Sequence, residues 1–75
     1  MTTLHIQLPD SVFSIFQKTP QELSQDLLLA AVVKWYELGL ISQGKGAEIT
    51  NLSREQFMLA LSRLQVSPFQ YTLVD

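Results

Sequence analysis

The chain has 75 residues, a formal net charge of −2 at pH 7 and no cysteine, and 47% of its residues are hydrophobic. A chain of this length forms one domain that buries only roughly 60% of the surface of the unfolded polypeptide, so association would add stability. The absence of cysteine excludes disulfides and thiolate metal sites. The slightly negative charge argues against a surface that binds nucleic acid non-specifically all over, although it allows one basic face.

The hydropathy pattern predicts a protein outside the membrane. The longest apolar run, residues 27–33, is far too short to cross a bilayer. The first residues lack the basic start and apolar core of a signal peptide. The cytoplasm is therefore the expected location.

Residues 2–8 alternate between apolar and polar side chains, which is the period of a half-buried strand. One face carries Leu4, Ile6 and Leu8, and the other carries Thr3, His5 and Gln7. Such a strand needs a partner for its backbone amides, either the C-terminal segment or the same strand of a second subunit. Asp10 then caps a short helix that is predicted over residues 11–17.

A long central helix is predicted over residues 20–38. Thr19 is its N-cap, Pro20 fits the first helical position, and Glu22 completes a capping box. Gly39 ends the helix because glycine enters a left-handed conformation at the lowest cost.

This helix is apolar around most of its circumference, with only a narrow polar strip. A helix of that kind must be buried on several sides, and a short chain has little of its own with which to cover it. We therefore predict that the helix is the centre of a homodimer. The predicted dimer interface comprises Leu28, Leu29, Val32, Val33, Trp35 and Tyr36.

Residues 43–64 are predicted to form a hairpin of two short helices. The small Ala47 lets the helices approach, Asn51 suits a left-handed turn, and Ser53 caps the second helix. Phe57 starts the buried stripe of that helix. This spacing is typical of a helix-turn-helix, although many unrelated helical hairpins share it.

A last short strand is predicted over residues 69–74. The predicted fold class is thus α+β, mainly α, in a single domain of residues 1–75. Its order is an N-terminal strand, a short helix, the central helix, the helix-turn-helix-like hairpin and a short C-terminal strand.

The sequence resembles the small prokaryotic proteins grouped as uncharacterised protein family 0175, which are treated as predicted antitoxins of toxin–antitoxin pairs. The resemblance covers nearly the whole chain and rests on Leu8-Pro9, residues 28–39 (LLAAVVKWYELG), residues 44–48 (GKGAE) and residues 52–57 (LSREQF). Members tend to have Ala at position 46 and Gly at the turn, where this chain has Gly46 and Asn51. The resemblance implies a dimer that reads DNA or binds a toxin, and it supplies no catalytic or ligand residues.

Several polar side chains of the hairpin can donate to phosphates or base edges. The predicted DNA-binding residues are Gln43, Lys45, Ser53, Arg54, Gln56 and Arg63. The face of the second helix is nevertheless mixed, because Glu55 repels phosphate and Met58 with Leu59 is more typical of a protein contact.

No residue pattern predicts catalysis. His5 is the only histidine and has no carboxylate or cysteine at metal-ligand spacing, and Ser53 has no nearby base. We therefore expect no enzyme, no metal, no cofactor and no small-molecule substrate.

Three functional hypotheses follow. The first is an antitoxin or small transcriptional regulator that binds DNA as a homodimer through the hairpin. The second is a protein-interaction module that binds a partner, such as a toxin, without contacting DNA. The third, a weaker alternative, is a ribbon-helix-helix-like arrangement in which paired strands of residues 2–8 enter the DNA groove through Thr3, His5 and Gln7.

Overall fold

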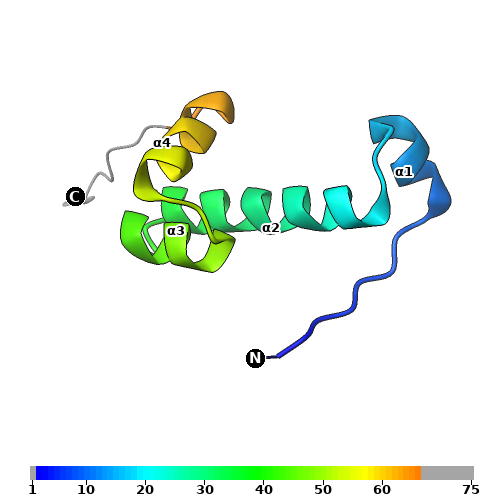
Figure 1. Ribbon diagram of the computed structural model, residues 1–75, viewed down its shortest axis with the longest axis horizontal. Helices are drawn as coiled ribbons and strands as arrows, with labels where there is room; N and C mark the ends of the chain where they lie inside the picture. The colour runs from blue at the N-terminus through cyan, green and yellow to red at the C-terminus, as the bar shows by residue number, and fades with distance from the viewer. Residues whose placement is uncertain (1, 67–75) are drawn as a thin grey trace.

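The computed structural model describes residues 2–66, and four helices account for most of them (Figure 1). They are α1 (Asp10–Phe16), α2 (Pro20–Glu37), α3 (Gln43–Thr50) and α4 (Arg54–Arg63). The long α2 carries α1 at its N-terminal end, and α3 and α4 lie together at its other end (Figure 1). No helix within residues 2–66 has the length and apolar character needed to span a bilayer.

The predicted α+β fold class is wrong for the part of the chain that is described, because residues 2–66 contain no strand. Residues 2–8, predicted to be a strand, precede α1 without regular structure, and they make no backbone hydrogen bond to another described segment. An alternating pattern favours an extended conformation, whereas a strand also needs a neighbour to pair with. The second predicted strand, residues 69–74, lies outside the described residues.

The start of α2 is fixed by short-range hydrogen bonds. The Thr19 hydroxyl accepts from the backbone N–H of Glu22 at 3.2 Å, and the Glu22 carboxylate accepts from the backbone N–H of Thr19 at 2.9 Å. Pro20 occupies the first turn, where no donor is needed. The chain leaves the helix through Gly39, which has a positive φ of 80°. The predicted helix 20–38 is thus observed as Pro20–Glu37.

The buried core lies where the C-terminal half of α2 packs against α3 and α4. Its members are Val32, Val33, Tyr36, Ala47, Phe57 and Leu61. The rings of Tyr36 and Phe57 meet edge to face, with centroids 6.0 Å apart and an interplanar angle of 88°, a geometry that aromatic pairs favour. We call this packed unit, residues 29–66, the C-terminal core.

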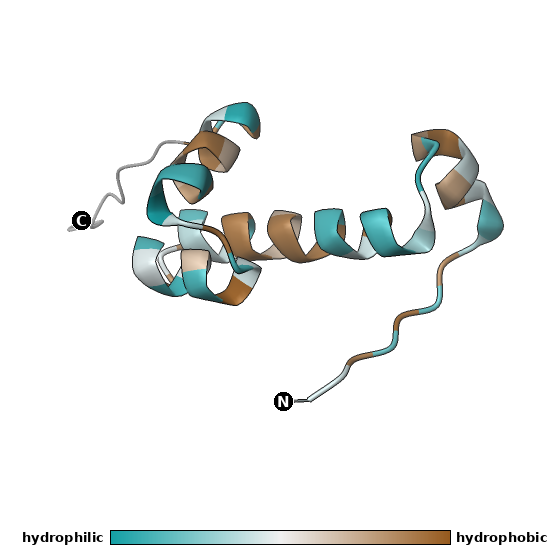
Figure 2. Cartoon of the chain, viewed as in Figure 1, coloured by the Kyte–Doolittle hydropathy of each residue, from teal (hydrophilic) through white to brown (hydrophobic). Residues whose placement is uncertain are grey.

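The remainder, residues 2–28, is packed much more loosely, and we call it the N-terminal region. Helix α1 has no buried residue, and Leu23 is the only buried residue among residues 2–28. Apolar and polar residues alternate along the segment that precedes α1 (Figure 2). This segment, residues 2–9, is called the N-terminal arm below.

Candidate nucleic-acid interface

The turn between α3 and α4 consists of Asn51, Leu52 and Ser53. Asn51 adopts a left-handed conformation, with φ 58° and ψ 37°, which a short polar side chain tolerates better than most. The backbone N–H of Leu52 donates to the carbonyl of Ala47 at 2.9 Å and closes the end of α3. Asn51 therefore does here what a glycine does at helix ends.

The two helices of the hairpin meet at Gly46. A Cβ atom added to this glycine would lie 2.5 Å from Cζ of Phe57 and 2.9 Å from its Cε2. Real side chains do not approach so closely, so an alanine at position 46 would force the Phe57 ring to move. The glycine and the buried aromatic ring together set the distance between α3 and α4.

The start of α4 is held by a capping box. The Ser53 hydroxyl accepts from the backbone N–H of Gln56 at 3.1 Å, and the Gln56 side-chain oxygen accepts from the backbone N–H of Ser53 at 2.9 Å. Both residues were predicted to contact DNA. Their oxygen atoms already accept hydrogen bonds that fix the first turn of α4, which leaves the Ser53 hydroxyl hydrogen and the Gln56 amide nitrogen as donors for an external contact.

Two further predicted DNA-binding residues lie on α3. The Gln43 amide donates to the hydroxyl of Tyr36 at 3.2 Å and is half-buried. The Lys45 ammonium pairs with Glu48 one turn along at 3.2 Å, on the surface. Exposed pairs of this kind are weak, so Lys45 can leave Glu48 for a phosphate at little cost, whereas Gln43 is held inward.

Arg54 and Arg63, the other two predicted residues, are exposed and form no ion pair within residues 2–66. They lie nine positions apart on α4, which places them on opposite sides of the helix and roughly 13 Å apart along its axis. The surface between them carries Glu55, Met58, Leu59 and Ser62, all of which are exposed. The outer face of α4 is therefore a mixed strip with one arginine on each flank.

The predicted dimer residues fall on two different sides of α2. Three of them, Val32, Val33 and Tyr36, are buried in the protomer's own core, and Leu29 packs against it. Leu28 and Trp35 remain 42% and 41% exposed. The apolar circumference of α2 is therefore shared between the protomer's core and an open face.

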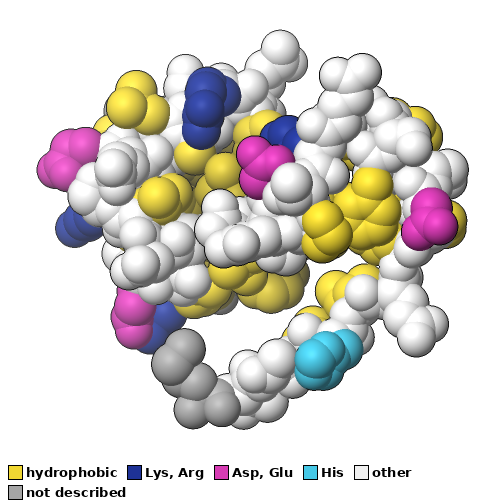
Figure 3. Space-filling model, turned by 45° about the vertical axis from the view of Figure 1, so that its right-hand side comes forward, with side chains coloured by type: hydrophobic (Ala, Val, Ile, Leu, Met, Phe, Trp, Pro, Cys, Tyr) yellow, Lys and Arg dark blue, Asp and Glu magenta, His cyan; other side chains and the backbone are white. Residues whose placement is uncertain are grey.

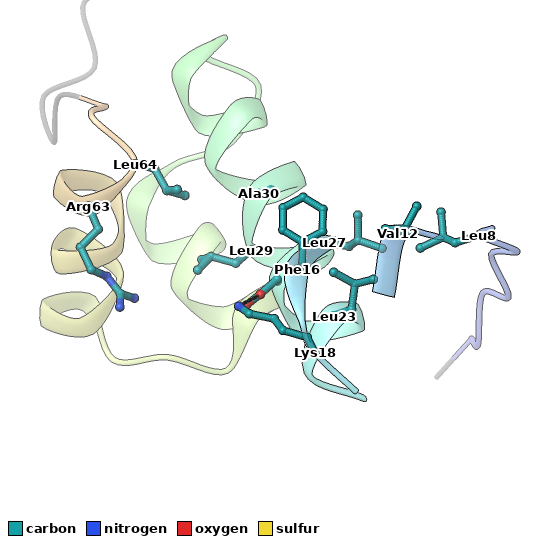
Figure 4. A pocket seen from close by; sticks show the side chains of 11 residues that line it. Leu8, Val12, Phe16, Lys18, Leu23, Leu27, Leu29, Ala30, Arg63 and Leu64 are labelled. Atoms are coloured by element: carbon teal, nitrogen blue, oxygen red, sulfur yellow. Dashed lines mark hydrogen bonds and ion pairs between the residues drawn. The ribbon is translucent and has the colours of Figure 1, made fainter. Parts of the chain in front are cut away.

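Sequence patterns did not reveal an apolar groove of about 550 Å³ between α1, the N-terminal half of α2 and the end of α4. Phe16, Val12 and Leu23 gather on one side of it, and Arg63 with Leu64 reaches it from α4 (Figure 4). The charged residues Lys18 and Asp26, which pair with each other, also line it. The only signal for this groove in the sequence was the surplus of apolar residues in α1 and α2.

One carboxyl group has a perturbed pKa. The backbone N–H of Thr19, with its hydroxyl, donates to the Glu22 carboxylate and holds the pKa of Glu22 below its ordinary value of 4.5. This shift belongs to the cap of α2 and is far from the hairpin. The described residues contain no group of three or more His, Cys, Asp or Glu side chains that could hold a metal ion.

Comparison with known proteins finds a family match. The model of a family described as "Uncharacterised protein family (UPF0175)" matches residues 1–75. No curated protein and no solved structure matches the chain.

Proposed function

We propose, from the premise that the chain belongs to the uncharacterised protein family UPF0175, that this protein is a small homodimeric DNA-binding regulator of the antitoxin type. The α3–α4 hairpin is the DNA-contacting element. The proposal rests on the geometry of this hairpin. It combines a close helix crossing at Gly46, a left-handed turn at Asn51 and an exposed α4 flanked by two arginines that form no ion pair within residues 2–66.

The spacing of the arginines suits a helix that lies in the major groove. This groove is about 12 Å wide and admits one α-helix between its two phosphate backbones. Arg54 and Arg63 project from opposite sides of α4, so each can reach a different backbone. The strip between them then faces the bases, where Glu55 can accept from a cytosine amino group and Leu59 can contact a thymine methyl group.

Two copies would bring two such helices to the same duplex. The open face of α2, with Leu28 and Trp35, gives the proposed homodimer an apolar contact. A dimer doubles the number of phosphate contacts, which matters because the net charge of one chain is −2 and a single hairpin supplies few cations.

The test measures affinity for a promoter fragment of the protein's own gene by fluorescence anisotropy at two salt concentrations. We expect Arg54→Ala with Arg63→Ala to weaken binding about 10-fold or more and to reduce the salt slope by about 1 for each arginine that no longer neutralises a phosphate. Lys34→Ala is the control for loss of a positive charge away from the hairpin, because it removes one charge from an exposed residue of α2 that pairs with Glu37. It should change the affinity little.

Absence of any salt-dependent binding at micromolar protein would overturn the proposal, as would equal losses of affinity for the arginine pair and for Lys34→Ala. Helical content measured by circular dichroism must remain unchanged in all variants, so that a loss of affinity reports contact with DNA.

A second candidate function is a protein-interaction module, which the apolar part of the α4 face favours. Leu59 is 66% exposed and Met58 is 42% exposed, and neighbouring apolar side chains on a helix surface are typical of protein contacts. In this case a partner protein, such as a toxin, binds α4, and Leu59→Ser abolishes that binding while the arginine variants leave it intact. The DNA-binding proposal predicts the opposite ranking, with the arginine variants the more harmful.

A further inference from the structure

We propose that the N-terminal arm forms an interface with a second copy of this chain. Two arms lie side by side in opposite directions, and their apolar side covers the grooves of both copies. The inference deepens the homodimer of the proposed function and does not depend on DNA contact. It concerns the contact between copies, and the described part of each protomer remains all-α.

The arm has the properties of an unpartnered interface element. Leu4 is 81% exposed and Ile6 is 62% exposed, and both lie on the same side of an extended chain whose other side is polar. No backbone N–H or C=O group of residues 2–8 forms a hydrogen bond within the described part of the chain. An extended segment with an apolar side, whose backbone groups find no partner within residues 2–66, is suited to pairing with another chain.

The groove is continuous with the arm. Leu8, the last apolar residue of the arm, lines the groove together with residues of α1 and α2. Apolar side chains lie on the body of the molecule beside the hollow that separates it from the arm (Figure 3). The apolar row of the arm therefore ends in an apolar groove of about 550 Å³, and a second arm laid along the first would extend the contact between them.

A second copy fits the arm better than the described part of the same chain. The walls of the groove are helices, whose backbone groups are largely used within the helices themselves. An arm folded onto its own groove would bury Leu4 and Ile6 but would still lack protein partners for its amides. Leu8 lines the groove. Leu4 is four residues before Leu8, so in an extended chain it lies roughly 13 Å from Leu8.

The arm is also compatible with itself. Residues 2–8 contain no Asp, Glu, Lys or Arg, so two arms meet without repulsion between like charges. If a two-fold axis relates the two arms, their apolar residues lie on the same side only when one residue of the arm lies opposite its own copy. An axis between two residues would set apolar residues opposite polar ones. An axis at His5 sets Leu4 opposite Ile6 of the second copy, and an axis at Ile6 sets Leu4 opposite Leu8 of the second copy.

A cysteine scan of the full-length protein tests the proposal, because the chain has no cysteine of its own. Single variants from Thr3→Cys to Gln7→Cys are oxidised mildly at low protein concentration, and disulfide-linked dimers are counted on a non-reducing gel. A disulfide forms only when the two Cα atoms come within about 4.4–6.8 Å. We expect the yield to peak at His5→Cys or Ile6→Cys and to fall on both sides, while Leu40→Cys, exposed outside the arm, gives no cross-link.

A second measurement compares dimer affinity by analytical ultracentrifugation. Leu4→Asn with Ile6→Asn removes buried apolar side chains from both arms and should raise the dimer dissociation constant about 100-fold or more, and Leu40→Asn should leave it unchanged. A monomeric wild-type protein overturns the proposal. A dimer that gives no peak of cross-linking within the arm, or that keeps its affinity in the double variant, overturns it as well and assigns dimerisation to another surface. Neither measurement uses DNA, so failure of DNA binding would leave a positive result in place.

Discussion

The C-terminal core and the N-terminal region contain the same kinds of apolar residue but bury them very differently. In the core, Val32, Phe57 and Leu61 are each 0% exposed. In the N-terminal region, Ile15 and Phe16 of α1 remain exposed. Both regions expose apolar side chains, such as Phe16 in the N-terminal region and Leu59 in the C-terminal core, but only the C-terminal core also contains a cluster of fully buried ones.

The two regions also differ in how tightly neighbouring helices approach. Helix α3 packs against both α2 and α4, with Gly46 directly against Phe57. Helix α1 meets the rest of the chain mainly along the groove, where Val12 and Phe16 line one wall. A change of one methyl group should therefore matter in the core and be tolerated in the N-terminal region.

The largest expected effect comes from a matched pair of phenylalanines. Phe57→Ala should lower the free energy of unfolding by about 3–5 kcal/mol, because it removes a fully buried ring and leaves a cavity. Phe16→Ala, at an exposed position, should change the stability of the dilute protomer by no more than about 0.5 kcal/mol. Urea unfolding followed by circular dichroism measures both, and equal losses of stability would contradict the division into two regions.

A smaller effect is expected from the two glycines of α3. Gly46→Ala should cost about 1–3 kcal/mol, since the new methyl group collides with the Phe57 ring. Gly44→Ala meets only the Ser42 hydroxyl at 4.0 Å, so it should stabilise the helix by up to about 1 kcal/mol through helix propensity. Opposite signs in thermal unfolding would support the close helix crossing. A stabilised Gly46→Ala variant would show that Phe57 moves aside easily.

The smallest effect concerns Glu22 at the start of α2. Its pKa is lowered in the folded protein by hydrogen bonds from Thr19, so the carboxylate stabilises the fold above the unfolded pKa, and this contribution is lost as the pH falls through the folded pKa. Between about pH 6 and pH 3, the wild type should therefore lose slightly more stability than Glu22→Gln. Identical pH profiles in urea unfolding would show that the charge of the capping carboxylate does not stabilise the fold.

Much of the secondary structure follows from the sequence because its signals act over three or four residues. Thr19 with Glu22 forms the predicted capping box, and Ser53 caps α4 as predicted. Asn51 adopts the left-handed conformation expected of the turn. The start of α2 and the start of α4 could therefore be assigned without knowledge of the fold.

The sequence identifies the residues of the DNA-contacting and dimer surfaces less completely than it identifies the helix starts. Ser53 and Gln56 look like DNA-contacting residues when their chemistry alone is considered, yet their oxygens are used in the cap of α4. The predicted dimer face of α2 likewise combined residues of the protomer's own core, such as Tyr36, with residues of the open face, such as Trp35. Composition identifies a helix as apolar all round, but it does not say which side another helix of the same chain covers.

The sequence by itself determined where α2 and α4 begin, where the hairpin turns and that α2 is apolar around most of its circumference. These properties depend on hydrogen bonds and side chains close together along the chain. Only the tertiary structure decided that Val32 and Val33 face inward while Leu28 faces out, that residues 2–8 find no strand partner within residues 2–66, and that Phe57 lies against Gly46. Each of these facts depends on contact between segments distant in sequence, and no local pattern specifies which distant segment will be the partner.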